Sequence, residues 1–405
     1  MKPGALDVHV GNTRAGSLAR SAVRDAEFLF DYATGTASDS AVSLTMPVVP
    51  DQYDSMNTVH PVFEMSLPEG ALRERLQRAF GKTIPGFDDP DLLGIVGTSQ
   101  IGRLRYANPG QPLLAVPAQS TKELLTYRGT ADLMEDLLQR FATTSGVSGM
   151  QPKVLIRDAD ALPRLTHRDT THIVKMFDPR AYPELAANEF FCMRAAAFCG
   201  LPVPTVQLSA NRRVLVVERF DLGPDGHYLG FEDFCVLNAL RAAGRYDASY
   251  ELIARRITQF ISPKHLPEAL ENFFLMVALS CAIGNGDAHL KNFGVLYRDP
   301  ESSVWLAPAF DIVSTRVYAP RDSMALTMQE SKAFPTRAIL LGFARAGCYL
   351  SLRRAQGLLD QVLSAVAKAR REIRRFARAH PDFATAATTL TNVFDQQVAL
   401  LQHDK

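Results

Sequence analysis

Hydrophobic positions alternate with polar ones in short runs near the start of the chain, a pattern typical of strands. Two such runs, Leu6–Val10 and Arg14–Leu18, flank Gly11-Asn12, and this combination predicts a β-hairpin. A helix is predicted over Pro68–Phe80, where apolar residues recur at helical spacing, and a further strand pair is predicted around Ile95–Tyr106. None of these elements carries chemistry by itself, so a structural or partner-binding role is expected for this region.

The middle of the chain combines β-type runs with one helix. The helix is predicted over Pro183–Cys199, because a proline lies at its start and Gly200 just past its end. The predicted strands are Val154–Ile156, His172–Met176, Val206–Leu208 and Val214–Val217. A sheet with one helix is the composition expected of a small nucleotide-binding lobe.

Beyond about residue 230 the pattern becomes helical. The predicted helices are Phe231–Ala243, Ser249–Ile261, Leu266–Ile283, Ala338–Ala346, Ser351–Ala379 and Pro381–Gln402. A hairpin within residues 293–310 interrupts them. The whole pattern predicts an α+β fold with domains at residues 1–107, 108–227 and 228–405: a β-rich N-terminal lobe with an extra N-terminal subdomain, followed by a mainly helical C-terminal lobe.

Composition narrows the function class without naming one. With 405 residues, 47% of them hydrophobic and 21% charged, the chain is expected to be a soluble globular protein with two or three cores. A net charge of +1 excludes a global field that recruits nucleic acid or membrane. The five cysteines form no Cys-x-x-Cys, and the N-terminus lacks the apolar run of a signal peptide, so buried thiols and a cytoplasmic location are expected.

The most informative stretch is Gly284–Asn292, followed 19 positions after Asn292 by Asp311. A kinase needs a carboxylate to deprotonate the acceptor hydroxyl, and an amide oxygen and a second carboxylate to hold Mg²⁺. Asp287, Asn292 and Asp311 supply these groups in that order, and the step from Asp287 to Asn292 matches that of the kinase catalytic loop. The intervening hairpin predicts that Asn292 and Asp311 face one metal ion, because a hairpin brings its open ends together.

The competing interpretation is that these side chains cap helices or satisfy turns. It accounts for each residue alone but not for their order and spacing. His289 is a further candidate metal ligand, but no second His or Cys stands at ligand spacing, which disfavours a zinc site.

Two upstream motifs suit a phosphate site. The stretch Gly146–Lys153 precedes a predicted strand, and its glycines allow backbone N–H groups to approach a phosphate while Lys153 adds charge. It matches neither common glycine-rich phosphate motif, so an ordinary turn is the competing interpretation.

Lys175 ends an apolar strand, as the phosphate-binding lysine of kinases does, and Glu189 in the next helix is its candidate partner. The alternative is a lysine that reaches solvent at a strand end.

A third motif, Val214–Asp221, runs from a strand into a polar stop at the predicted lobe boundary. Backbone groups at the boundary between two lobes commonly form hydrogen bonds with an adenine ring. Glu218 and Phe220 are therefore candidates for main-chain contacts with adenine, and Asp221 is a candidate for a contact with the ribose. A plain strand end followed by a linker competes with this interpretation.

Together these residues closely resemble the HipA family of bacterial serine/threonine kinases, which act as toxins of type II toxin–antitoxin modules. The resemblance covers nearly the whole chain. It rests on the motifs Ser-Gly-Met-Gln-Pro-Lys (148–153), Thr-His-Ile-Val-Lys (171–175), Asn-Glu-Phe-Phe (188–191), Glu-Arg-Phe-Asp (218–221), Gly-Asp-Ala-His-Leu-Lys-Asn (286–292) and Phe-Asp-Ile (310–312).

The resemblance implies a two-lobed protein-kinase-like fold that uses ATP and Mg²⁺. By position, Asp287 matches the catalytic base, and Asn292 and Asp311 match the metal ligands. The implied nucleotide-binding residues are Ser148, Gly149, Met150, Gln151, Pro152 and Lys153 of the phosphate loop, Lys175, the hinge residues Glu218, Arg219, Phe220 and Asp221, and His289, Leu290, Lys291, Asn292 and Phe310.

The implied partners are a small helix-turn-helix antitoxin (HipB-like) that represses the operon, and protein substrates that in studied members are aminoacyl-tRNA synthetases. Family members often carry serine at the first or third position of the tripeptide before the loop glycine, where autophosphorylation silences the kinase. Here the tripeptide is Gly146-Val147-Ser148, so Ser148 is the autophosphorylation candidate and Ser145 a weaker one. A small-molecule kinase and a pseudokinase that acts as an antitoxin-binding co-repressor are the alternative functions.

Between Arg353 and Arg378 one predicted helix carries eight basic residues against two acidic ones. Its apolar positions, including Leu359, Val362 and Ile373, are expected to form a buried stripe, which makes the basic residues a solvated outer face. The alternative is contact with operator DNA or an acidic partner.

Overall fold

The computed structural model describes residues 5–84, 86–128, 133–149, 151–160 and 170–402. Within them the chain forms two compact units, each assembled from separate stretches. The β-rich unit comprises residues up to Phe177 together with Ser209–Ala242 and Val295–Val304. The helical unit comprises Asp178–Leu208, Ala243–Gly294 and the chain from Trp305 onward. This is the predicted α+β, kinase-like composition, but the chain passes between the units several times.

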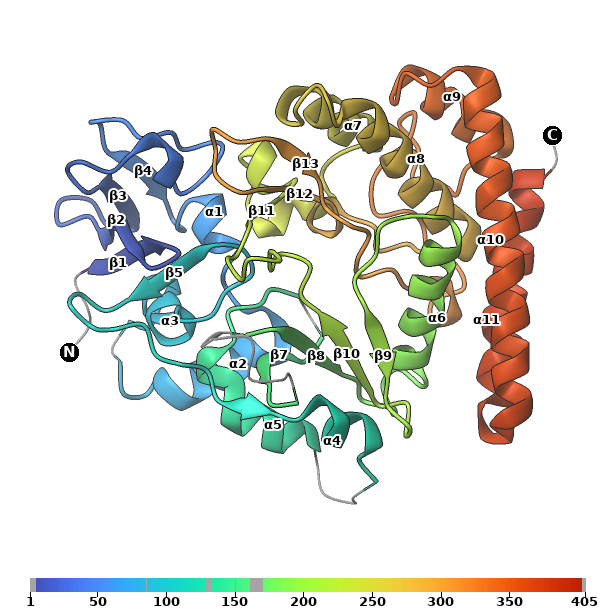
Figure 1. Ribbon diagram of the computed structural model, residues 1–405, viewed down its shortest axis with the longest axis horizontal. Helices are drawn as coiled ribbons and strands as arrows, with labels where there is room; N and C mark the ends of the chain where they lie inside the picture. The colour runs from blue at the N-terminus through green and yellow to red at the C-terminus, as the bar shows by residue number, and fades with distance from the viewer. Residues whose placement is uncertain (1–4, 85, 129–132, 150, 161–169, 403–405) are drawn as a thin grey trace. The chain divides into compact units, whose positions relative to one another are not determined.

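The first sheet of the β-rich unit has the strand order β4-β3-β2-β1-β5, all antiparallel (Figure 1). Its strands are β1 (Ala5–Val10), β2 (Thr13–Arg20), β3 (Glu27–Tyr32), β4 (Tyr53–Met56) and β5 (Leu104–Ala107). The helices that follow β4 are α1 (Pro61–Glu64), α2 (Gly70–Phe80) and α3 (Asp89–Val96). The predicted hairpin and the helix ending at Phe80 are confirmed.

The strand pair predicted around Ile95–Tyr106 is wrong in its first half, because Ile95 lies in α3. Asp88 begins that helix: its carboxylate accepts a hydrogen bond from the main-chain N–H of Asp91, and the Asp91 carboxylate accepts one from the main-chain N–H of Asp88. This capping box fixes the helix start, and only β5 forms from the predicted pair.

The second sheet runs in the order β6-β7-β8-β10 within the β-rich unit, and all of its neighbours are antiparallel except the parallel pair β6 and β7. These strands are β6 (Ala118–Gln119), β7 (Lys153–Asp158), β8 (His172–Met176) and β10 (Val214–Glu218). The helices α4 (Thr121–Thr126) and α5 (Leu133–Phe141) pack beside β10 and β7. Both sheets contribute to one hydrophobic core that includes Val8, Phe30, Tyr106, Val154 and Val174. All strands predicted in this region are confirmed, including β9 (Val206–Leu208).

The helix predicted over Phe231–Ala243 is wrong. Gly230–Asp233 forms strand β11, which joins β12 (Gly294–Tyr297) and β13 (Val304–Leu306) in a third sheet. The Asp233 carboxylate then accepts the main-chain N–H groups of Cys235 and Val236, which turns the chain. Two short 3₁₀ helices follow, Val236–Asn238 and Ala242–Tyr246.

A buried carboxylate explains why β11 forms. Glu232 accepts hydrogen bonds from the Tyr297 hydroxyl (2.5 Å), the Ser43 hydroxyl (2.8 Å) and the main-chain N–H of Leu44 (2.8 Å). Burial raises the pKa of Glu232, and these donors oppose that rise. The strand is therefore held by residues distant in sequence, whereas its apolar spacing resembles that of a helix.

The helical unit contains α6 (Leu185–Phe198), α7 (Tyr250–Phe260), α8 (Leu266–Ile283), α9 (Arg337–Ala346), α10 (Leu352–Ala379) and α11 (Ala384–Gln402). Each matches a predicted helix within a few residues. The long helices α10 and α11 lie side by side (Figure 1), and α10 also packs on α6, α8 and α9. Among the described residues α8 alone is long and apolar enough to span a membrane, but 72% of it is buried, as in a core helix. All five cysteines are buried thiols.

The basic helix α10 buries its apolar stripe as predicted, because Leu359, Val362 and Ile373 are fully buried. Two of its arginines are paired within the unit, Arg354 with Glu271 and Arg370 with Asp395. The basic residues that are exposed along it are Arg353, Arg354, Lys368, Arg371, Arg374, Arg375 and Arg378.

Candidate active site

The loop that carries Asp287 leaves the core at the end of α8. Gly284 ends the helix in the left-handed conformation with φ of 68°, which glycine adopts at little cost. Gly286 is required for a different reason: a Cβ atom there would lie 2.2 Å from Oδ2 of Asp322 and 2.5 Å from the carbonyl oxygen of Ser323. Larger residues at position 286 would therefore displace the loop.

The Asp287 carboxylate reaches solvent and accepts a hydrogen bond at Oδ1 from the hydroxyl of Tyr246 (2.8 Å). Desolvation by the surrounding protein raises the pKa of Asp287 to about 6. The Tyr246 hydrogen bond opposes this rise, the negative charge of Asp311 adds to it, and Arg245 opposes it. At neutral pH the group is therefore an ionised carboxylate with enough basicity to accept a proton.

Asn292 and Asp311 are brought together as the sequence predicts. Nδ2 of Asn292 donates to Oδ2 of Asp311 at 3.4 Å, and Oδ1 of Asn292 accepts the main-chain N–H of His289. The connecting chain forms the predicted hairpin of β12 and β13. Asp311 itself has a φ of 57°, a left-handed conformation that is uncommon for a residue with a side chain.

A carboxylate and an amide are side chains whose oxygens Mg²⁺ takes as ligands, so the residue types fit that ion. Here Nδ2 of Asn292 faces Asp311 and Oδ1 accepts from His289, so joint ligation would require the Asn292 amide to turn. A small pocket in the helical unit is lined by both residues together with Asn285, Phe293 and Phe310. Within the described part of the chain, no group of three or more His, Cys, Asp or Glu residues is placed to hold a metal ion.

The residues between Asp287 and Asn292 differ in accessibility. Burial lowers the pKa of His289 to about 4, so its ring is neutral at physiological pH. Leu290 is fully buried, so a ligand could meet only its main chain, whereas Lys291 is partly exposed.

In the β-rich unit, the loop Gly146–Lys153, which is predicted to bind phosphate, is shaped by contacts with residues that precede it. A Cβ atom on Gly146 would lie 1.9 Å from Nε2 of Gln100, so a side chain at position 146 would require this buried glutamine to move. The Ser148 hydroxyl donates to Oε1 of Glu69 at 2.7 Å. Gln151 and Pro152 are partly exposed, and Met150 lies outside the described residues.

Two buried lysines lie next to each other beside this loop. Lys153 on β7 and Lys175 on β8 are directly opposite in the antiparallel register, and they are 6% and 5% exposed. A Cβ atom on Gly149, whose φ is 120°, would lie 2.3 Å from Nζ of Lys153, so the ammonium group lies against the loop. The predicted partner of Lys175, Glu189 on α6, belongs to the helical unit, and their pairing stays a prediction.

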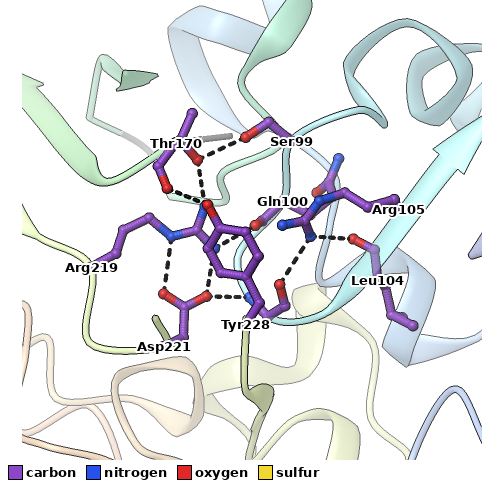
Figure 2. Close-up of polar contacts among 9 residues, drawn as sticks. Ser99, Gln100, Leu104, Arg105, Thr170, Arg219, Asp221 and Tyr228 are labelled. Carbon is purple, nitrogen blue, oxygen red and sulfur yellow. Dashed lines mark hydrogen bonds and ion pairs between the residues drawn. The ribbon is translucent and has the colours of Figure 1, made fainter. Parts of the chain in front are cut away.

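The hinge motif is built around a buried ion pair (Figure 2). Nε and Nη2 of Arg219 donate to the two carboxylate oxygens of Asp221, at 3.0 and 2.5 Å, and the main-chain N–H of Gly102 donates to Oδ2 at 2.6 Å. The Tyr228 ring stacks on the Arg219 guanidinium, with 4.3 Å from Cζ to the ring centroid. Arg105 packs over the same ring at 4.5 Å.

This arrangement argues against the predicted contact between the Asp221 side chain and a ribose. Both carboxylate oxygens are used inside the unit, and Asp221 and Arg219 are 1% and 3% exposed, so neither side chain is open to a ligand. Glu218 is exposed and Phe220 packs edge to face on Phe231, which leaves their main-chain adenine contacts as a prediction.

Comparison with protein-family models gives two matches that together span most of the chain. The HipA-like C-terminal domain matches residues 145–370, more than half of the chain, and the HipA N-terminal domain matches residues 6–107. The chain belongs to the HipA family.

Curated relatives and a solved structure agree with this membership. The Sinorhizobium fredii protein named "Putative kinase Y4mE" is 30% identical over 345 residues, covering 78% of this chain and 79% of that protein. A second protein from that organism, "Putative kinase Y4dM", is 31% identical over 40% of this chain and 41% of its own length. The HipA of a Shewanella oneidensis complex of HipA, HipB and operator DNA has the same fold, with a TM-score of 0.71 and 19% identity, covering 99% of this chain and 100% of that chain.

Sequence reasoning missed the residues that support the loop Gly284–Asn292 of this HipA-family chain. Tyr246 contacts Asp287, the Tyr250 hydroxyl donates to the carbonyl of Ala288 (3.1 Å), and the Thr315 hydroxyl accepts from the main-chain N–H of Gly286 (2.8 Å). All three contacts join residues at least 29 positions apart. No spacing rule in a single sequence connects such pairs.

Proposed function

We propose that this HipA-family chain is a serine/threonine protein kinase that transfers the γ-phosphate of ATP to a protein hydroxyl with the help of Mg²⁺. The observation that carries the proposal is the arrangement in the helical unit: a solvent-accessible carboxylate at Asp287, and the adjacent amide and carboxylate of Asn292 and Asp311, 3.4 Å apart. The adjacent buried lysines Lys153 and Lys175 support it from the β-rich unit, because they suit a polyphosphate.

In the proposed reaction Asp287 accepts the proton of the acceptor hydroxyl. The hydroxyl oxygen then bonds to the γ-phosphorus, and the bond from that phosphorus to the β–γ bridging oxygen breaks, which releases ADP. Asn292 and Asp311 would hold Mg²⁺, which when bound neutralises charge on the phosphate oxygens. Lys153 and Lys175 would offset the remaining phosphate charge and orient the nucleotide.

The proposed biological role is that of a cytoplasmic toxin whose kinase activity arrests growth, with an aminoacyl-tRNA synthetase as the proposed substrate. The proposed antagonist is a HipB-like helix-turn-helix antitoxin. Support comes from the structural neighbour, which was solved with HipB and operator DNA. Operator DNA is proposed to be reached only through or alongside the antitoxin.

Autophosphorylation is proposed to occur at Ser148. Ser148 is partly exposed, whereas position 146 is a glycine and carries no hydroxyl. A phosphate of charge near −2 on Ser148 would compete with ATP for the loop's backbone donors. Intact-mass measurement and peptide mapping after incubation with ATP should locate one phosphate on Ser148; phosphate found elsewhere, or none, would contradict this site.

The toxin role is tested by expressing the wild type, Asp287→Asn and Asp311→Asn from one inducible promoter. Removing a general base lowers rates by about 10²- to 10⁴-fold, so both variants are expected to permit growth while accumulating as folded protein. Arrest by either variant would contradict the kinase mechanism and favour the pseudokinase alternative. Arrest by the wild type alone, with label found only in a metabolite, would favour a small-molecule kinase.

The exposed face of α10 provides a test of the operator contact. If this face lies against DNA in the antitoxin complex, reversing the charges of Arg374 and Arg375 should weaken operator binding and reduce its salt dependence. If operator affinity and its salt dependence are unchanged, this face of α10 does not contact DNA and is exposed to solvent.

A further inference from the structure

Tyr246 lies at the end of the 3₁₀ helix Ala242–Tyr246 and touches the catalytic loop in two ways. Its hydroxyl donates to Oδ1 of Asp287 at 2.8 Å. Its ring packs edge to face on the ring of His289, with centroids 5.1 Å apart at 75°. On the other side, the carbonyl oxygen of Tyr246 accepts a hydrogen bond from Nζ of Lys332 at 3.2 Å. The tyrosine is therefore held by contacts at its ring, hydroxyl and main chain.

The hydrogen bond falls on one of the two carboxylate oxygens. A carboxylate has acceptor capacity at both oxygens, so Oδ2 can receive a second donor while Tyr246 holds Oδ1. A side chain fixed at one oxygen has fewer rotamers to lose when a reacting hydroxyl arrives, which is the entropic advantage of a prearranged catalytic group.

We propose that Tyr246 is a positioning residue for phosphoryl transfer, which holds Asp287 through Oδ1 so that Oδ2 faces the acceptor hydroxyl. This inference rests on the proposed kinase function and deepens it. It assigns the hydroxyl no chemical step of its own, since Tyr246 acts through Asp287.

The charges around Asp287 give this role a second signature. Asp311 and Asp322 disfavour its ionised form, whereas Arg245 and the Tyr246 hydroxyl favour it. Removing the hydroxyl should therefore raise the pKa of Asp287 and move the acid limb of the activity profile to higher pH. A residue that only supports the fold would not shift that limb.

The test compares Tyr246→Phe with Tyr250→Phe and Tyr349→Phe. Tyr250 supports the same loop through the carbonyl of Ala288, and Tyr349 is 66% exposed, so these variants control for loop support and for hydroxyl loss in general. Tyr246→Phe is expected to lower kcat by about tenfold or more, the effect typical of losing a hydrogen bond to a charged group, with KM for ATP unchanged. A rate equal to that of the wild type, or a faster one, would overturn the inference. A faster rate would mean that the Tyr246 hydroxyl occupies the place where the acceptor hydroxyl binds.

A readout without turnover separates this inference from the kinase proposal. Carboxyl-¹³C NMR should follow the titration of Asp287 in the wild type and in Tyr246→Phe, with the resonance assigned by Asp287→Asn. A higher pKa in Tyr246→Phe supports the inference, and an unchanged pKa overturns it. Absence of phosphate transfer by the wild type contradicts the proposed function alone, whereas transfer that Asp287→Asn abolishes and Tyr246→Phe leaves unchanged contradicts the inference alone.

Discussion

The Ser148 hydroxyl donates a hydrogen bond to the Glu69 carboxylate at 2.7 Å, which connects the proposed phosphate loop to the residue that precedes α2. A phosphate on Ser148, or a carboxylate that mimics it, would face Glu69 as a like charge. The loop is therefore expected to separate from Glu69 when Ser148 becomes negative.

Ser148→Asp is accordingly expected to weaken ATP binding by about tenfold, because the loop loses one hydrogen bond and gains a repulsion of about 1 kcal/mol. Ser148→Asp with Glu69→Gln should recover part of that loss, and Ser148→Ala serves as the neutral control. Isothermal titration with ATP measures the effect. If the second substitution recovers nothing, Glu69 has no part in the response.

Gly146→Ser is expected to destabilise the β-rich unit by about 1–3 kcal/mol, since the new side chain collides with Gln100. Gln100 cannot simply move away, because its Nε2 donates to the carbonyl of Val96 at 3.0 Å. Chemical denaturation gives the free energy of unfolding. The control is Gly357→Ala on α10, where a Cβ atom meets nothing within 4 Å; it should be neutral or stabilising by up to about 1 kcal/mol. Equal effects at the two sites would refute the steric argument.

Asp221→Ala is expected to cost about 3–5 kcal/mol of stability, because it leaves the Arg219 guanidinium buried without its carboxylate. The matched control is Asp225→Ala, which removes a solvent-exposed ion pair with Arg298 and should change the stability far less than Asp221→Ala does. Denaturant unfolding of both variants measures the difference. A small cost at Asp221 would mean that the cluster in Figure 2 does not hold the hinge.

His60 predicts an acid sensitivity of the fold. Burial lowers the pKa of His60 to about 4, below its ordinary value of 6.5, and its neutral Nδ1 accepts the main-chain N–H of Val62. The unfolded chain therefore binds the proton more readily, so stability is lost as the pH falls from about 6.5 toward 4. His60→Asn keeps a capping acceptor without a titrating ring and should flatten that part of the stability profile. An identical profile in the variant would exclude His60 as a contributor.

The long helices were predictable because their signals are local. Ser249 and Ser351 cap α7 and α10 with their hydroxyls, Gly284 ends α8, and the apolar stripes recur over several turns. The proximity of Asn292 and Asp311, which follow Asp287 in the chain, was also predictable from the sequence, because a hairpin of ordinary length separates these two residues.

The failures occur where distant residues decide the local structure. Phe231–Ala243 has the apolar spacing of a helix, but its first residues form a strand. The buried Glu232 in that strand accepts hydrogen bonds from Tyr297 and Ser43, which are distant in sequence. Asp221 had the position of a ribose ligand, but Arg219 and Gly102 use its carboxylate. No pattern in the sequence indicated the contact between Tyr246 and Asp287, since these residues are 41 positions apart.

The most direct test of the central claim is phosphate transfer by the purified chain. Wild type, Asp287→Asn and Asp311→Asn are incubated with cell lysate, Mg²⁺ and ATP labelled in the γ-phosphate, and the labelled band is identified. The account predicts a protein band carrying phosphoserine or phosphothreonine with the wild type, reduced by about 10²-fold or more in Asp287→Asn. Equal labelling by Asp287→Asn, or label confined to small molecules, would contradict it.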